Sequence, residues 1–454
     1  MIKSYSSSLH QFLTISLIFC SSSLIVVSAD VSPSKRFSYE LKPNSFHVSV
    51  DETEYGVWYR ALPIKNYPFS LYFYQTNDES TAGTGFNKPE FGIHTYILAI
   101  GMGNLKPTTR WVWEANLDHP VGENAKLVFS RSGNLALNDG DGQIVWQTRT
   151  NNKGVVDIQL LPNGNLVLLD RNGGFVWQSF YHPTNTLLIG QGLGPGSSTT
   201  NKIVNGKYSM VLQDKTLRLF FNPNPKSLSS KSLTYYKVSP LMDLGVNITF
   251  NTIIDPDYFD ELIMFTGSGT DTLFYFANPK FNSTWSMLRL SSNGNLYIYT
   301  YLELPGNGNN VWVETYAAFS KKERSECFLP EMCGSYGLCE DHQCVACPTP
   351  KGLMGWDNKC KLPDVPSYNA STAANVGYYK VKDVEDYRPL GDSDGEGPMM
   401  VKECMKKCSD EVKCVGFFYR NDGSMCSLAS QINTLAKLHA VFTGLIDAYI
   451  KYAK

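Results

Sequence analysis

The chain has 454 residues, 43% of them hydrophobic and 18% charged, and its formal net charge is -2 at pH 7. This length and this hydrophobic content provide for several packed cores and exclude a disordered chain, so we expect more than one domain. No dense run of lysine or arginine occurs, and the electrostatic footprint of a nucleic-acid-binding protein is therefore missing.

The first 29 residues are predicted to be a cleaved signal peptide. They hold a basic residue, Lys3, an apolar stretch from Phe12 to Val27, and a small-residue site at residues 27–29. The alternative, an uncleaved signal anchor, requires an uninterrupted apolar span of about 20 residues, which the serines of this stretch break. No later stretch approaches that length, and the polar C-terminus does not fit a lipid-anchor signal. We therefore expect a secreted protein that does not span a membrane.

The cysteines and the glycosylation sequons agree with export. Of the eleven cysteines, Cys20 lies within the predicted signal peptide and all the others fall between Cys327 and Cys426. Their even number predicts a disulfide framework in the last third of the chain, so the residues before it must be held together by packing alone. Asn-X-Ser/Thr sequons predict N-glycosylation at Asn247, Asn282 and Asn369.

Short apolar or aromatic runs alternate with glycine, asparagine and aspartate from about residue 37 to residue 325, which is an all-β pattern. Within it, the segment SGNLAL at 132–137 is repeated 31 residues later as NGNLVL at 163–168. Each copy is followed by a strand ending in Val-Trp-Gln, whose tryptophan, Trp146 or Trp177, lies 12 residues after the asparagine. Each unit is therefore predicted to be a hairpin with a glycine-containing turn and an inward tryptophan.

Such hairpins are expected to pack around a shared axis as a prism or small barrel, because two strands with one apolar face cannot form a core alone. A third echo, SNGNLYIY at 292–299 with Trp312 beyond it, predicts a second prism of the same type over residues 188–325. For this third copy the alternative is an ordinary hairpin turn, since Asn-Gly favours turns in any β protein.

Two longer segments resemble the plant bulb-type (mannose-binding) lectin family. Residues 113–120 (WEANLDHP) are similar to its W-x-A-N-R-x-x-P segment, with Leu117 in place of the usual arginine. Residues 177–188 (WQSFYHPTNTLL) match almost residue for residue the W-Q-S-F-x-x-P-T-D-T-L-L segment that ends the family's first lectin domain. The cysteine pattern resembles the EGF-like and PAN or apple modules of S-domain receptor kinases and S-locus glycoproteins. In particular, the chain resembles their kinase-less members, the epidermis-specific secreted glycoproteins.

This resemblance implies a mainly β fold with two tandem β-prism domains of the bulb-lectin type, at residues 30–187 and, of the S-locus glycoprotein type, at 188–325. It implies a small EGF-like disulfide module at 326–362 and an α+β PAN/apple module at 363–454. Residues 398–408 are predicted to be helical, which places Cys404 and Cys408 on one face. Spacing alone leaves the connectivity open. The resemblance implies the pairs Cys327 with Cys339, Cys333 with Cys344, Cys347 with Cys360, Cys404 with Cys426, and Cys408 with Cys414.

Bulb-type lectins bind mannose through a Q-x-D-x-N-x-V-x-Y strand. Its polar side chains hydrogen-bond to sugar hydroxyls, its valine packs on the sugar ring, and its tyrosine closes the site. No copy in this chain keeps both the glutamine and the aspartate, and each lost hydrogen bond costs about 1 kcal/mol, so we expect weak or lost sugar affinity. In the alternative, the asparagines only shape the hairpins. The candidate sugar-binding residues are Asn134, Asn163, Asn165, Val167, Asn293, Asn295 and Tyr299.

Catalytic and metal sites find little support in the sequence. The histidines are scattered, no Gly-X-Ser-X-Gly elbow or His-Glu-X-X-His pair occurs, and no two carboxylates suggest a glycosidase, so we expect no enzyme. Cys344 and Cys347, with His342, fit disulfides better than a metal or redox cluster in an exported chain. Residues 392–397 (DSDGEG) lack the ligand spacing of a calcium-binding EF-hand. We predict no metal and no cofactor.

Together these features predict a secreted, lectin-like glycoprotein of the cell wall or apoplast. Its expected partners are mannose-type glycans or extracellular glycoproteins, bound by the prisms. The cysteine-rich modules are expected to serve protein contacts or a homodimer. The alternative function is that of a structural or interaction protein of the cell wall whose prisms bind no sugar.

Overall fold

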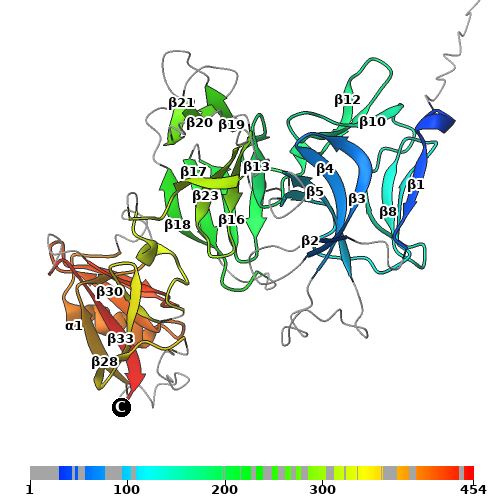
Figure 1. Cartoon of the computed structure of the whole chain (residues 1–454). Helices are drawn as coiled ribbons and strands as arrows, with labels where there is room; N and C mark the ends of the chain where they lie inside the picture. The colour runs from blue at the N-terminus through cyan, green and yellow to red at the C-terminus, as the bar shows by residue number, and fades with distance from the viewer. Residues whose placement is uncertain are drawn as a thin grey trace, which may run out of the picture.

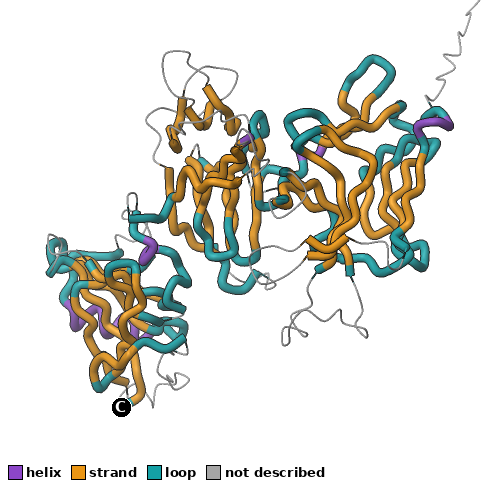
Figure 2. The backbone as a smooth tube through the Cα atoms, in the orientation of Figure 1, coloured by secondary structure: helices purple, strands orange, loops and turns teal. Residues whose placement is uncertain are grey.

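The computed structural model is mainly β, as predicted (Figures 1 and 2). Its described part contains one α-helix, and the predicted signal peptide and the asparagines of the three glycosylation sequons lie outside that part. Short 3-10 helices span Pro33–Lys35, Ser179–Tyr181 and Glu326–Phe328. The structure describes residues 30–42, 47–49, 57–76, 95–103, 109–196, 198, 200–214, 216–225, 232–238, 248–253, 261–266, 272–277, 285–302, 311–321, 324–334, 336–358, 360, 376–387, 395–438 and 444–454.

Three antiparallel sheets form what we call the first body, which contains the two predicted hairpins. One sheet is ordered β1 (Phe37–Glu40), β7 (Lys126–Phe129), β8 (Leu135–Asn138) and β9 (Ile144–Gln147). The second is ordered β10 (Asp157–Leu160), β11 (Leu166–Leu169) and β12 (Phe175–Gln178). The third is ordered β2 (His47–Ser49), β3 (Val57–Asn66), β4 (Phe69–Gln75), β5 (Tyr96–Met102) and β6 (Arg110–Glu114).

A glycine turn leads into the first strand of each hairpin, β8 and β11. Gly133 and Gly164 have φ of 81° and 85°, in the left-handed region that favours glycine. At Gly164, a Cβ atom would lie 2.6 Å from Leu188 Cδ1 and 2.7 Å from the Phe69 ring, so the turn also packs too closely for any side chain. The repeated asparagine that follows each glycine is thereby held at the start of a strand.

Three tryptophans meet at the centre of the first body, one from the last strand of each sheet. The ring centroids of Trp113, Trp146 and Trp177 lie 5.7, 5.9 and 6.1 Å apart, and each pair of rings is nearly perpendicular. Edge-to-face packing is the arrangement that aromatic rings favour. The inward position predicted for Trp146 and Trp177 is confirmed, and β6 supplies Trp113 as the third member.

Three four-stranded antiparallel sheets form the second body. One is ordered β13 (Thr186–Leu188), β22 (Ser286–Leu290), β23 (Leu296–Leu302) and β24 (Val311–Ala317). Another is ordered β14 (Gly192–Leu193), β19 (Ile248–Ile253), β20 (Glu261–Thr266) and β21 (Thr272–Ala277). The last is ordered β15 (Lys202–Asn205), β16 (Tyr208–Gln213), β17 (Thr216–Phe221) and β18 (Leu233–Val238). The number of sheets is thus the same in both bodies.

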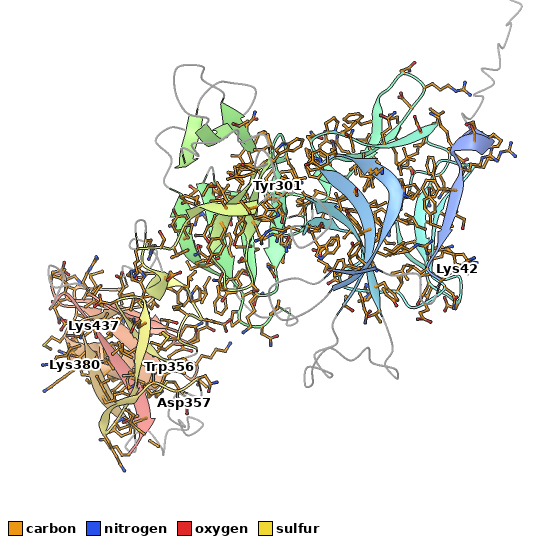
Figure 3. The ribbon with its side chains drawn as sticks, in the orientation of Figure 1. Lys42, Tyr301, Trp356, Asp357, Lys380 and Lys437 are labelled. Atoms are coloured by element: carbon orange, nitrogen blue, oxygen red, sulfur yellow. A yellow bond between two sulfur atoms is a disulfide. The ribbon has the colours of Figure 1, made fainter. Side chains whose placement is uncertain are left out.

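One sheet of the second body packs on both bodies. Met287 and Tyr301 belong to the buried core of the first body, whereas Leu288 and Ile298, on the opposite faces of the same strands, belong to the core of the second. Figure 3 shows Tyr301 on the side of the second body that faces the first. Because the β13-β22-β23-β24 sheet is buried on both faces, the two bodies form one packed unit.

The C-terminal region carries the only α-helix of the described residues, α1 (Val401–Asp410), which confirms the predicted helix. At ten residues it is too short to cross a bilayer, and no helix in the described part could do so. One sheet is ordered β27 (Gly352–Gly355), β26 (Gln343–Thr349), β25 (Leu338–Glu340), β32 (Leu435–Lys437) and β29 (Val384–Glu385). The other is ordered β28 (Val376–Lys382), β33 (Ile446–Ala453), β30 (Gly416–Arg420) and β31 (Met425–Ala429).

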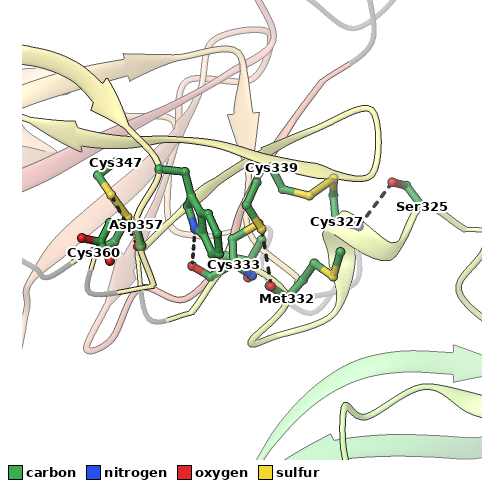
Figure 4. Close-up of a disulfide and its surroundings, with 11 residues drawn as sticks. Ser325, Cys327, Met332, Cys333, Cys339, Cys347, Asp357 and Cys360 are labelled. Atoms are coloured by element: carbon green, nitrogen blue, oxygen red, sulfur yellow. Dashed lines mark hydrogen bonds between the residues drawn. A yellow bond between two sulfur atoms is a disulfide. The ribbon is translucent and has the colours of Figure 1, made fainter. Parts of the chain in front are cut away.

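The five disulfides join the pairs that the resemblance implied, and they lie within the C-terminal region. Figure 4 shows the surroundings of Cys327, Cys339, Cys347 and Cys360. β25, in the first cysteine-rich segment, pairs in parallel with β32, close to the end of the chain. The two expected cysteine modules therefore share one sheet, which the sequence did not indicate. The bonds are Cys327–Cys339, Cys333–Cys344, Cys347–Cys360, Cys404–Cys426 and Cys408–Cys414.

Glu385, on β29, is expected to make the stability of this region depend on pH. Burial raises the pKa of its carboxyl to about 7; Asp386 also raises it, whereas Arg324 and Arg420 oppose the shift. A folded-state pKa above the ordinary value of 4.5 means that the folded chain retains a proton that the unfolded chain releases. The stabilisation is complete below pH 4.5 and is lost as the pH rises through 7, so the melting temperature should fall by several degrees between pH 5 and pH 8.

The control for this prediction is Glu385→Gln, which keeps the shape of the side chain but does not titrate. Melting temperatures of both proteins, measured by circular dichroism from pH 4 to pH 8, should diverge as the pH rises, with the variant the more stable above pH 7. Parallel curves for the two proteins would show that this carboxyl is not the titrating group.

Candidate functional site

The candidate sugar residue of the first hairpin, Asn134, is only 5% exposed, and its amide is engaged within the hairpin. Its Nδ2 donates to Gln147 Oε1 at 3.0 Å. Its Oδ1 accepts from Thr148 Oγ1 at 3.2 Å and from the backbone N–H of Thr150 at 3.0 Å. The side chain therefore ties the start of β8 to the end of β9 and to the turn that follows.

The second hairpin repeats this arrangement. Asn165 is 3% exposed, and its Nδ2 donates to Gln178 Oε1 at 2.8 Å. Its Oδ1 accepts from Ser179 Oγ and from the Phe180 backbone N–H, both at 3.2 Å. In both copies the glutamine stands 13 residues after the asparagine, so the repeated Val-Trp-Gln supplies the partner as well as the inward tryptophan.

Two further asparagines have the same role with backbone partners. Asn295, in the third copy, has no exposed surface; its Nδ2 donates to Phe319 O at 2.8 Å and its Oδ1 accepts from Phe319 N at 3.0 Å. In the third sheet of the first body, Asn116 Oδ1 accepts from Leu98 N at 2.8 Å and its Nδ2 donates to His119 O at 3.0 Å. The only feature of the sequence that pointed to Asn116 was its place in the segment 113–120.

Asn163 and Asn293, by contrast, lie exposed on the turns. Asn163 Oδ1 accepts from the backbone N–H of Asn165 at 3.2 Å, and Asn293 Oδ1 accepts from that of Asn295 at 2.9 Å. Asn293 Nδ2 also donates to Tyr297 OH at 3.4 Å. Both asparagines therefore shape their turns and still face solvent, where a ligand can reach them.

The positions that pack on the sugar in the lectin motif are also buried here. Val167 has no exposed surface, although it lies on the opposite face of β11 from Leu166 and Leu168, which belong to the main core cluster of the first body. At the place of the closing tyrosine in the first copy stands Asn138, whose Oδ1 is buried without a hydrogen-bond partner among the described residues. An unpaired buried acceptor costs about 1–3 kcal/mol, which a hydroxyl donor would relieve.

Tyr299, the candidate of the third copy, is partly covered by the first body. The Arg110 guanidinium lies 4.7 Å from the centre of the Tyr299 ring and 5.5 Å from that of Trp312, both within cation–π range. Tyr299 and Trp312 pack against the core of the first body. The outer face of the third copy is therefore used for contact between the bodies.

A buried polar cluster lies at the same junction. Tyr74 OH donates to Glu114 Oε1 at 2.5 Å, and Arg289 donates to Thr186 Oγ1 at 3.2 Å and to the backbone oxygen of Trp111. Burial raises the pKa of Glu114, although Tyr74 and Arg289 oppose the shift, and burial lowers the pKa of Arg289 to about 10. These groups join β4 and β6 of the first body to β13 and β22 of the second, and no sequence motif indicated them.

The structure excludes the metal or redox cluster that was the alternative for Cys344 and Cys347, because each forms a disulfide. His342 Nδ1 lies 3.8 Å from Glu326 Oε2, which is an ion pair when the imidazole is protonated. Within the described ranges, no three histidine, cysteine or acidic side chains are grouped to hold a metal ion. Residues 392–394 of the acidic run lie outside those ranges.

Comparison with known proteins agrees with this arrangement. Residues 109–206, which contain both hairpins, match the family described as D-mannose binding lectin. The chain is 38% identical to EP1-like glycoprotein 1 of Arabidopsis thaliana, over 95% of this chain and 97% of that protein. It is 40% identical to the epidermis-specific secreted glycoprotein EP1 of Daucus carota, over 69% of this chain and 84% of that protein.

A more distant relative is the G-type lectin S-receptor-like serine/threonine-protein kinase SD2-5 of Arabidopsis thaliana. It is 25% identical over 84% of this chain, but the match covers only 44% of the kinase. The EP1-like match, in contrast, extends over nearly the whole of both proteins. The chain therefore belongs to the EP1-like glycoproteins and has a domain of the D-mannose binding lectin family at residues 109–206.

Proposed function

We propose that this protein is a secreted, lectin-like glycoprotein of the cell wall or apoplast that binds mannose-type glycans, free or on extracellular glycoproteins, with weak affinity. The observation that carries the proposal is the match of residues 109–206 to the D-mannose binding lectin family, since this segment holds both hairpins. Secretion is supported by the signal-peptide pattern of the first 29 residues and by the name of the carrot relative. The relatives named as EP1-like glycoproteins support a binding protein rather than an enzyme.

The domain assignment is part of this proposal. Three sheets around one tryptophan cluster support a β-prism at residues 30–187, and three further sheets support a second one at 188–325. The disulfide pairs support an EGF-like module at 326–362 and a PAN/apple module at 363–454. The glycosylation sites at Asn247, Asn282 and Asn369 remain predictions from their sequons.

Weak affinity follows from the use of the asparagine amides. Asn134, Asn165 and Asn295 have both ends of their amides bonded within the protein, so they support the site and offer no free group to a sugar. In our proposal the direct contact in the first body comes from Asn163, which is exposed on its turn.

A glycan array with the purified protein tests the function. We expect weak binding to mannose-type glycans, and we expect Asn163→Ala to lower the affinity about fivefold, since one hydrogen bond contributes about 1 kcal/mol. Asn172→Ala is the matched control, because Asn172 is exposed on the next turn of the same body and should leave binding unchanged. Melting temperatures of all variants establish that the fold is intact.

The array also distinguishes the function from the fold. Absence of binding to any mannose-type or wall glycan would exclude the lectin activity without affecting the family membership. Partner proteins that were still captured from a deglycosylated extract would then indicate a protein-interaction role.

A further inference from the structure

The hairpin formed by β26 and β27 exposes an apolar strand at a sheet edge. β27 pairs with β26 on one side, and on its other side no strand of the described part pairs with it. Leu353 and Met354 are each 63% exposed and Trp356 is 43% exposed. Figure 3 shows Trp356 and Asp357 at the border of the C-terminal region. An edge of this kind is a template for pairing with another strand, and proteins normally blunt such edges with charges, proline or a bulge.

The sequence of this edge is complementary to itself. Residues 351–357 read KGLMGWD. Lys351 lies in the turn before β27, and Trp356 and Asp357 directly follow the strand. If two copies pair in antiparallel fashion with Met354 on the two-fold axis, and the register is continued beyond the strand ends, Lys351 comes opposite Asp357 and Gly352 opposite Trp356. In the same register Leu353 stands opposite Gly355. Each charge then faces its opposite, Leu353 and Trp356 each face a glycine, and Met354 faces Met354 of the other copy.

Open space at the glycines fits this register. A Cβ atom added at Gly352 or at Gly355 would meet no other atom within 4 Å, so the positions that face the partner's Trp356 and Leu353 are vacant in one copy. A shift of the register by one residue removes the match, because it places Leu353 opposite Met354 or opposite Trp356 and leaves no ion pair. Only the centred register satisfies size and charge together.

A second apolar contribution comes from the neighbouring strand. The register of β26 and β27 places Val345, which is 40% exposed, beside Trp356 and on the same face as Met354. Trp356 Nε1 donates to the backbone oxygen of Cys333 at 3.5 Å, which orients the indole ring. The disulfide Cys347–Cys360, shown with Asp357 in Figure 4, fixes the base of the hairpin. The edge is therefore held in shape before any partner binds.

We propose that β27 is a homodimer contact, in which it pairs with β27 of a second copy about a two-fold axis through Met354. A second copy is the partner that the charges favour, because the same surface supplies both the lysine and the aspartate, as an isologous interface requires. Lys351 of each copy binds Asp357 of the other, and the apolar face of Val345, Met354 and Trp356 continues across the axis. The sheet that contains β27 in one copy then continues into the corresponding sheet of the other copy.

Sedimentation velocity of the full-length secreted protein over a dilution series tests this contact. We expect a concentration-dependent dimer with twice the mass of the deglycosylated monomer. Met354→Asp places two carboxylates side by side on the axis and should raise the dimer dissociation constant at least about tenfold. Val412→Asp is the control: Val412 is 68% exposed in the same region but lies away from the hairpin, so dimerisation should not change.

A charge exchange tests the register. Lys351→Asp alone places two pairs of acidic side chains across the axis, and Asp357→Lys alone places two pairs of lysines there, so each variant should be monomeric. When the two variants are mixed, both ion pairs can form again, and a heterodimer should appear with an affinity close to that of the unmodified protein. A protein that is monomeric at all concentrations, or a dimer that all these variants leave unchanged, would overturn the proposal.

Discussion

Replacing Trp177 by alanine is expected to lower the free energy of unfolding of the first body by about 4 kcal/mol. The indole is only 9% exposed, and it packs against Trp113 at 6.1 Å, Trp146 at 5.9 Å and the ring of His182 at 5.4 Å. Its removal leaves a cavity at the point where the three sheets meet. The neighbouring strands are held by their own ladders, so they cannot close that cavity.

Guanidinium chloride unfolding followed by circular dichroism measures this loss. The matched control is Phe175→Ala, which removes an aromatic ring that is 50% exposed on the same strand as Trp177 and should cost less than about 1 kcal/mol. Trp177→Phe, which keeps an aromatic ring at the centre, should lose less than the alanine variant. Equal losses for Trp177→Ala and Phe175→Ala would contradict the central role of the tryptophan cluster.

The hairpins could be predicted from the sequence because their determinants are local. Each unit places a glycine turn, an asparagine and a Val-Trp-Gln strand within a short segment, and the structure confirms the turns and the inward Trp146 and Trp177. Trp113 was not grouped with them, because β6 lacks the Gly-Asn-Leu segment that made the other two units recognisable. Its position could be inferred only from the packing of all three sheets.

The burial of the candidate asparagines was harder to predict. The motif alone does not distinguish an amide that faces a sugar from one that bonds to its own hairpin, and both alternatives were open for Asn134 and Asn165. The decisive partners, Gln147 and Gln178, were visible in the repeat, but their contact depends on the bulge between β8 and β9 and on the corresponding bulge between β11 and β12. The same geometry leaves Asn163 exposed on the turn before β11.

The contact between the two bodies could not be predicted, because its members are far apart in the chain and follow no motif. Arg289 and the backbone oxygen of Trp111 that it binds are separated by 178 residues. Tyr299 illustrates the effect on the site, since its place in the motif suggested a sugar contact and its place in the structure puts Arg110 over its ring. A long-range contact thus changed the environment of a residue that a local pattern had selected.

Replacement of Arg289 by methionine should show how much the contact between the two bodies contributes to the free energy of unfolding. The guanidinium is buried, donates to Thr186 Oγ1 and to the Trp111 backbone oxygen, and attracts the carboxylate of Glu114. Methionine fills much of the space but leaves Glu114 in a buried site without its cation. The acceptors on Thr186 and Trp111 also lose their donor, and an unsatisfied buried polar group costs about 1–3 kcal/mol, so we expect a loss of stability of about that size at pH 7.

A double-mutant cycle distinguishes the charge interaction from packing. Glu114→Gln removes the carboxylate charge and retains an acceptor for the hydroxyl of Tyr74. In the unmodified protein this hydroxyl lies 2.5 Å from Glu114 Oε1. In the Arg289→Met, Glu114→Gln double variant no buried charge remains unpaired, so its loss in unfolding free energy should be clearly smaller than the sum of the two single losses. Thermal and guanidinium unfolding of the four proteins gives the coupling energy directly. Strict additivity would mean that Arg289 stabilises the junction through its bonds to Thr186 and Trp111 alone.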